Sequence, residues 1–431
     1  MKKSFLYFIC SVSAMGGLLF GYDWVVIGGA KPFYEPFFGI ENSPALQGLA
    51  MTAANIGCLA GACTAGALAD RFGRKPLLIT AAVLFTVSAI TTGIFNDFTL
   101  FNIARFLGGI GIGVASALSP MYIAEVSPAN IRGRMVSLNQ MTIVLGILAA
   151  QIVNMLIGHG VTMDWGTEWG WRWMFWAETL PAALFLVMSF MIPESPVFVA
   201  LQQDKRAGIT RQKGTNDTAI GALFSNRKYT RVLVLGLIIA VFQQWCGTNV
   251  IFNYAQEIFT GAGFNIDGMF MDIVITGIAN VLFTFVALYT VEKWGRRSLM
   301  LIGSCGLCLI YLILGTCYFF EVKGVMMVVL VVMAISCYAM TLGPITWVLL
   351  SEIFPNRIRG IAMATCTFAL WVGCCTLTYT FPIMNASLGS YGSFWIYSGI
   401  CLVAFLYLSK YCPETKGKSL EELENELVSK N

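Results

Sequence analysis

Twelve separate runs of mostly apolar residues constrain this chain more than any other feature of its sequence. They lie near residues 5–29, 45–69, 76–95, 98–124, 135–158, 171–192, 232–259, 267–291, 299–320, 325–350, 360–382 and 392–409. A helix needs about 20 apolar residues to cross the ~30 Å hydrocarbon core of a bilayer. Only 12% of the 431 residues are charged, whereas about 25% are charged in soluble domains. We therefore predict an all-α membrane protein with twelve transmembrane helices.

The even-numbered connections between the predicted spans are more basic than the odd-numbered ones. If the N-terminus is cytoplasmic, the outer connections contain essentially Lys31 and Lys323. The remaining basic residues then lie inside, which predicts cytoplasmic N- and C-termini in an inner or plasma membrane. The first run contains Asp23 and lacks a small-residue cleavage site, which favours a retained span over a signal peptide. The basic residues on the inner side include Lys2, Lys3, Arg71, Arg74, Lys75, Arg132, Arg134, Lys293, Arg296, Arg297, Arg357 and Arg359.

Three short motifs occur twice, in the same order, at a separation of roughly 220 residues, which indicates an internal duplication. The pairs are Asp70–Lys75 with Glu292–Arg297, Glu125–Gly133 with Glu352–Gly360, and Pro193–Pro196 with Pro413–Lys416. Two parallel repeats around a central site form the rocking architecture of a large class of transporters. We expect a six-helix bundle at residues 1–192, a cytoplasmic linker at 193–231, a second six-helix bundle at 232–409 and a cytoplasmic tail at 410–431.

The repeated motifs place acidic and basic residues at the cytoplasmic ends of both halves. Such groups can pair across the interface between the halves when an inner gate is shut, and separate when it opens. The alternative is that they only anchor the topology. The candidate gate residues are Asp70, Arg71, Arg74, Glu125, Arg132, Glu194, Glu292, Arg296, Arg297, Glu352, Arg359 and Glu414.

Further short motifs complete an ordered pattern along the whole chain. They are Gly21-Tyr22-Asp23, the two Arg-rich loops, Pro193–Pro196, Gln243-Gln244 through Asn249, Gly343–Trp347, Ser351–Pro355 and Pro413–Gly417. This set resembles the sugar porter family of the major facilitator superfamily, and within it the bacterial xylose–proton and related sugar–proton symporters. The resemblance implies the major facilitator fold and transport of a monosaccharide, a pentose or hexose, by proton symport with alternating access. A passive sugar facilitator and a polyol or inositol transporter are the alternatives.

The same resemblance implies a sugar site formed mostly by the second half. Neutral amides suit a sugar because they both donate and accept hydrogen bonds and bury no charge. For any single amide the alternative is a hydrogen bond between helices. Trp347 and Trp371 could lie against the apolar face of a sugar ring, although a buried tryptophan is also a common packing residue. The candidate binding residues are Gln140, Gln243, Gln244, Asn249, Asn253, Asn280, Trp347 and Trp371.

Two positions in this expected site depart from the family pattern. Asn253 stands where the family usually has an aromatic residue, and Leu370 stands where an amide usually precedes the tryptophan of span eleven. Because of these two departures, the resemblance does not identify xylose or glucose as the solute.

The ionisable residues Asp23, Arg105 and Glu178 lie inside predicted spans. Counting about 1.5 Å per residue along each helix places them at similar depth. Burial favours the neutral form of an acid and a nearby arginine favours the carboxylate, so a pair that forms and breaks could bind and release a proton. The resemblance agrees, because proton-coupled members have an aspartate at this position of span one. The alternative is a static ion pair that only holds helices together.

Other classes of function have little support in the sequence. Gly417-Lys418-Ser419 would need a glycine at position 412 to form a phosphate-binding loop, and Cys412 stands there. The cysteines lack metal-ligand spacing, and His159 is expected at the surface. We therefore expect no enzyme activity, no metal and no cofactor. The expected partners are a monosaccharide, a proton and the lipid bilayer, without nucleic acid, for a chain that functions as a monomer.

Overall fold

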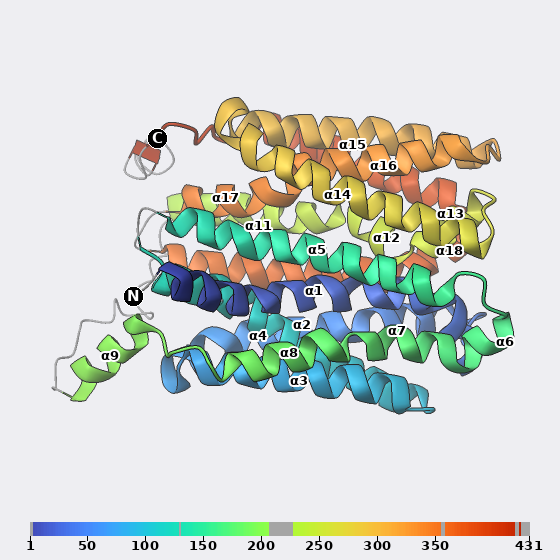
Figure 1. Cartoon of the computed structure of the whole chain (residues 1–431). Coiled ribbons are helices and arrows are strands. Elements are labelled where there is room, and N and C mark those ends of the chain that lie inside the picture. The colour runs from blue at the N-terminus through green and yellow to red at the C-terminus, as the bar shows by residue number, and fades with distance from the viewer. Residues whose placement is uncertain (1–2, 129–130, 207–226, 355–357, 419–421, 424–431) are drawn as a thin grey trace.

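The computed structural model describes residues 3–128, 131–206, 227–354, 358–418 and 422–423. Long helices lie side by side in a single bundle, and short turns connect them (Figure 1). Throughout, the proximal end is the end of the bundle that carries α9 (Pro196–Arg206), and the distal end carries α6 (Met163–Trp165) and α13 (Ala255–Gly261).

The first half begins with five long helices. They are α1 (Lys3–Phe38), α2 (Pro44–Phe72), α3 (Arg74–Ile94), α4 (Phe98–Val126) and α5 (Arg132–Gly158). The sixth predicted span is broken into α7 (Trp171–Ala177) and α8 (Thr179–Ser189), and α6 and the π-helix η1 (Gly166–Gly170) lead into it.

The second half contains more helix breaks than the first. Its helices are α11 (Arg227–Trp245), α12 (Thr248–Asn253), α13, α14 (Ile266–Trp294), α15 (Arg296–Phe319), α16 (Val325–Met340), α17 (Leu342–Ile353) and α18 (Arg359–Tyr411). The long α18 covers predicted spans eleven and twelve. Its two legs meet at Gly389, whose φ of 71° lies in the left-handed region that glycine adopts without strain.

Ten stretches of the described residues are long and apolar enough to cross a membrane. The last of them, Ile361–Tyr411, contains both legs of α18. The sixth predicted span is absent from these ten because α7 and α8 are each short. When α7 with α8, α11 with α12 and α13, and α16 with α17 each count as one span, and α18 counts as two, the helices of the described residues match the twelve predicted spans.

The first helix is longer than the sequence analysis predicted. Lys31 was expected in an outer connection, but α1 continues to Phe38 and only 2% of the Lys31 side chain is exposed. The carboxylates of Glu35 and Glu257 lie beside its ammonium group and offset the burial of its charge. The prediction for Lys31 is therefore wrong, because partners distant in sequence decide whether a charge can be buried.

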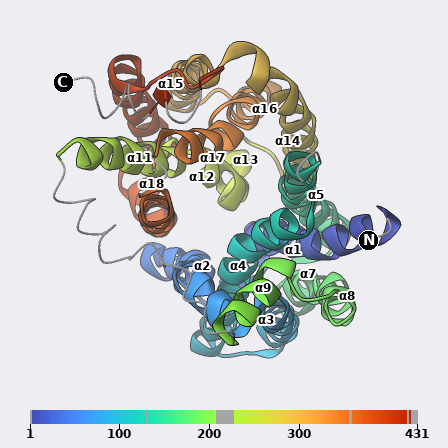
Figure 2. The same cartoon turned by 90° about the vertical axis from the view of Figure 1, so that its left-hand side faces the viewer.

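The two halves meet along helices α1, α2 and α5 of the first and α12, α13, α14 and α18 of the second (Figure 2). The Asn55 side chain of α2 donates a hydrogen bond of 3.2 Å to the Thr378 hydroxyl of α18. At the other seam, Gly277 of α14 packs directly against the side chain of Gln151 on α5.

Glycines let α1 and α5 pack closely within the first half. A Cβ atom at Gly21 would overlap the backbone carbonyl oxygen of Ile143, and one at Gly146 would overlap that of Leu18. We expect Gly21→Ala to destabilise the protein by about 1–3 kcal/mol, the usual cost of overpacking. A thermal unfolding midpoint several degrees below wild type would show it. Gly66→Ala is the control, because its Cβ would meet no atom within 4 Å. Equal midpoints for both variants would contradict the prediction.

Candidate functional site

The seventh span is broken twice near the middle of the bundle. α11 ends at Trp245, and Gly247 adopts a φ of 89° before α12 begins. A second break at Tyr254 separates α12 from α13. In the tenth span, Thr341 separates α16 from α17. Broken helices inside a membrane are tolerated where they are buried in protein or line a polar cavity, and in transporters they mark binding sites.

Three of the predicted amides form one hydrogen-bonded chain beside the first break. The Asn249 side-chain amide donates to Gln244 Oε1, and Gln244 Nε2 donates to Gln243 Oε1 at 2.7 Å. Gln243 Nε2 in turn donates to the Tyr338 hydroxyl at 2.5 Å. All three amides are buried. By their chemistry, the Tyr338 hydroxyl and the second N–H of each amide can each donate one further hydrogen bond.

Sequence reasoning missed Tyr338, which lies in the tenth span on α16. A tyrosine in an apolar run gives only a weak signal, because the same residue is common at membrane interfaces. Its contact with Gln243 joins α16 to the hydrogen-bonded chain of α11 and α12.

We expect Tyr338→Phe to weaken solute binding about tenfold, because Gln243 loses its acceptor and the amide chain loses its fixed direction. Equilibrium binding of a sugar panel to the purified protein would measure this. Tyr318→Phe is a matched control, since its hydroxyl also makes a hydrogen bond of 2.5 Å, to the Ile258 carbonyl oxygen outside the amide chain. An equal loss in both variants would point to general destabilisation.

The other predicted binding residues lie on α5, α12, α14, α17 and α18. Asn280 is buried in α14 and Gln140 is half-buried in α5. Asn253 is buried where α12 ends. Trp347, on α17, is 40% exposed and so is not fully packed against protein. Leu370 is buried in a hydrophobic core to which both halves contribute.

Trp371 of α18 lies at the seam between the halves rather than within one of them. Its ring centroid is 5.9 Å from that of Trp24 and 6.2 Å from that of Phe20, both on α1. Trp24 directly follows Asp23 in the sequence. This aromatic contact therefore connects α18 of the second half to the helix that carries the ionisable site.

Asp23, Arg105 and Glu178 come together inside the first half, on α1, on α4 and at the junction of α7 and α8. Each residue is 2% exposed. Arg105 donates from Nη1 to Asp23 Oδ1 and from Nη2 to the Asp23 carbonyl oxygen at 3.1 Å. Glu178 interacts electrostatically with both partners. Among the described residues, Asp23 Oδ2, Arg105 Nε and Glu178 Oε1 have no hydrogen-bonding partner.

The first proximal charge cluster joins four of the predicted gate residues. Arg74 pairs with Glu125 at 3.0 Å and with Asp70 at 3.5 Å. Glu194 accepts the backbone N–H of Arg74 at 3.0 Å, and Ser195 donates to Glu125.

The second proximal cluster repeats this construction. Arg296 pairs with Glu352 at 3.1 Å, and Thr415 donates to Glu352 at 2.6 Å. Glu414 accepts the backbone N–H groups of Arg296 and Arg297. Burial favours the neutral acid, but these N–H groups and that of Lys416 outweigh it and lower the pKa of Glu414.

The remaining gate candidates are less engaged with these clusters. Arg71 lies over the ring of Phe72, and Arg359 donates to the Phe354 carbonyl oxygen at 3.2 Å. The side chains of Arg132 and Glu292 lie outside the described residues. The ion pairs named above each join residues of the same half, so each proximal cluster is tied within its own half in this structure.

The sequence matches known transporters over nearly its whole length. The family model "Sugar (and other) transporter" matches residues 9–427. The D-xylose-proton symporter of Escherichia coli (strain K12) is 38% identical over 98% of this chain and 96% of its own length. The arabinose-proton symporter of Bacillus subtilis (strain 168) is 37% identical over 98% and 95%. The glucose facilitated diffusion protein of Zymomonas mobilis is 31% identical over 96% and 95%.

Solved structures give the same result for the fold. The inward open conformation of the xylose transporter XylE from E. coli superposes with a TM-score of 0.83, at 36% identity over 97% of this chain and 99% of that one. The structure of this symporter bound to 6-bromo-6-deoxy-D-glucose superposes with a TM-score of 0.77. Fold and sequence together define a multi-pass membrane transporter with the major facilitator fold. The chain belongs to the sugar transporter family. The predictions of family and fold class, and of a transporter rather than an enzyme, are confirmed.

Proposed function

We propose that this protein carries a monosaccharide across the cell membrane together with a proton, by alternating access. The two moving units are the bundles at residues 1–192 and 232–409, joined by the linker at 193–231. The observation that carries the proposal is the buried contact of Arg105 with Asp23, with Glu178 beside them. Two curated relatives named for proton symport, with xylose or arabinose as the sugar, support it.

The amide chain supplies the sugar site in this proposal. Hydroxyl groups of a sugar both donate and accept, and the free N–H groups and remaining lone pairs of Gln243, Gln244 and Asn249 match them. Because each amide is already held by its neighbour, little side-chain entropy is lost on binding. Asn280, Gln140, Asn253 and the two tryptophans, Trp347 and Trp371, complete the proposed wall.

In this proposal, proton binding changes which acidic side chain, Asp23 or Glu178, interacts with Arg105. With Asp23 ionised, Arg105 binds it through both the carboxylate and the backbone. When a proton binds Asp23 Oδ2, the attraction between Asp23 and Arg105 falls, and Glu178 is the acidic side chain that remains beside Arg105. The change frees α1 to move against α4, and Trp24 passes that movement to Trp371.

Alternating access requires that one end is closed while the other opens. At the distal end, Gly28 packs against the backbone of Asn253, and Gly160 N–H donates to Asp267 at 2.9 Å across the halves. At the proximal end the charge clusters are tied within their halves. We assign the proximal end to the cytoplasm from its excess of basic residues, with both termini inside. A monomer suffices, because one chain contains both halves and every proposed site residue.

A passive facilitator is the second candidate, because the Zymomonas relative is named for facilitated diffusion. Purified protein in sealed vesicles would decide between them. Labelled pentoses, hexoses and polyols are offered with an imposed inward proton gradient, with and without an uncoupler. Symport predicts accumulation above the external concentration that the uncoupler abolishes. Equilibration to the external concentration under both conditions would identify a facilitator, and uptake of none of these solutes would overturn the proposal.

A further inference from the structure

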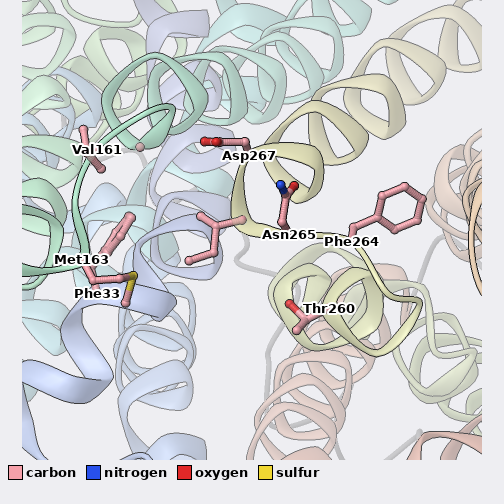
Figure 3. Close-up of a pocket in the computed structure, with 9 residues that line it drawn as sticks. Phe33, Val161, Met163, Thr260, Phe264, Asn265 and Asp267 are labelled. Atoms are coloured by element: carbon pink, nitrogen blue, oxygen red, sulfur yellow. The ribbon is translucent and has the colours of Figure 1, made fainter.

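The distal seam between the halves contains an open pocket and, next to it, a buried group of charges. The pocket has a volume of about 380 Å³. Phe33, Val161 and Met163 of the first half face Thr260, Asn265 and Asp267 of the second across it (Figure 3). Phe33 also stacks on Phe270 at 6.4 Å, so apolar packing joins the halves beside the pocket.

Lys31 on α1, two residues before Phe33 of the pocket, connects the halves through an ion pair. Its ammonium group forms an ion pair with Glu257 of α13 and lies 3.4 Å from Glu35 of its own helix. It also lies 4.9 Å above the ring of Tyr254. A lysine that is 2% exposed is expensive to bury, so its burial depends on these partners.

The partners of Lys31 are not equivalent. Glu35 belongs to the same helix and moves with Lys31 when the halves separate. Glu257 belongs to the other half, so opening the distal end must break its ion pair. Two carboxylates, of Glu35 and Glu257, surround the single ammonium group of Lys31. Glu257 Oε2 has no hydrogen-bonding partner among the described residues, and Glu35 Oε2 accepts a 3.4 Å hydrogen bond from Gln47. Glu41, in the turn after α1, adds negative charge near Glu35.

We propose that the ion pair between Lys31 and Glu257 is a latch that holds the distal end of the transporter closed, and that Glu35 keeps Lys31 compensated when the latch opens. The inference rests on the alternating access proposed above. Closing the distal end forms the pair and buries it. Opening returns both groups to water, where an ion pair contributes little. The two glutamates beside the same lysine therefore have opposite roles: Glu257 holds the halves together, and Glu35 does not.

Two spin labels across the distal end test the latch. Asp164→Cys in the first half and Val322→Cys in the second carry the labels, with the 13 native cysteines replaced. Distance distributions in lipid nanodiscs give the fractions of closed and open molecules. We expect Glu257→Gln and Lys31→Met each to raise the open-to-closed ratio at least about tenfold. The double variant should open no further than either single one, since the second change removes a pair already lost.

Glu35→Gln is the matched control, because it removes a carboxylate from the same lysine without touching the cross-half pair. We expect its open-to-closed ratio to stay at or below the wild-type value. An increase equal to that of Glu257→Gln, or additive effects of Lys31→Met and Glu257→Gln, would overturn the latch. A wild-type protein with one distance under all conditions, including saturating sugar, would instead contradict alternating access itself.

Discussion

Replacing Asp23 by asparagine is expected to abolish uphill sugar accumulation while leaving sugar exchange across the membrane intact. Asparagine keeps the shape of the side chain, but it has no site for a proton in this range of pH and no charge for Arg105. Arg105 then stays with Glu178, so the protein no longer distinguishes a protonated state from an unprotonated one. Vesicles under a proton gradient should equilibrate labelled sugar with the external solution and not exceed it, whereas wild type should concentrate it.

Asp272→Asn provides the control for Asp23→Asn. Asp272 is also a buried carboxylate within a span, on α14 of the other half, and its Oδ2 has no partner among the described residues. It lies outside the Asp23–Arg105 site, so accumulation should persist in that variant. Sugar accumulation at the wild-type level in Asp23→Asn would contradict the proposed coupling site. Loss in both variants would show only that spans of this protein tolerate no missing carboxylate.

The features that could be predicted from the sequence are those that the bilayer imposes locally. Apolar runs of fixed length give the spans, and repeated motifs give the two halves. Gln243, Gln244 and Asn249 stand out because an amide in an apolar helix needs a partner. The depth of Asp23 and Arg105 follows from helix rise alone, and the structure brings these two residues into contact.

The features that sequence reasoning missed depend on partners distant in the chain. Lys31 looks like a loop residue until Glu257, more than half the chain away, is placed beside it. Tyr338 joins the amide chain because the arrangement of α16, which ends at the break at Thr341, brings its hydroxyl to Gln243. The sequence does not predict the breaks at Gly247 and Tyr254 either, because glycine and tyrosine are also common in unbroken membrane-spanning helices.

Gln244 is the central member of the amide chain, and its removal should have the largest effect on sugar binding. It accepts from Asn249 and donates to Gln243, so alanine leaves an unpaired donor on one side and an unpaired acceptor on the other. Each unpaired buried group costs about 1–3 kcal/mol. Part of this cost also destabilises the protein without bound sugar. We therefore expect affinity to fall by about 10- to 100-fold, which is less than the two costs added together would give.

The measurement is equilibrium binding of the best sugar from the vesicle panel to Gln244→Ala, with Asn154→Ala as the control. Asn154 is a buried amide that donates to the Val26 carbonyl oxygen at 3.1 Å within the first half, away from the chain of amides. Its loss should lower stability and leave affinity near wild type. Because proton coupling depends on α1 and α4, Gln244→Ala should still concentrate sugar when enough is supplied to fill the weakened site. Unchanged affinity in Gln244→Ala would place the sugar elsewhere and leave the amide chain as a structural link between α11 and α16.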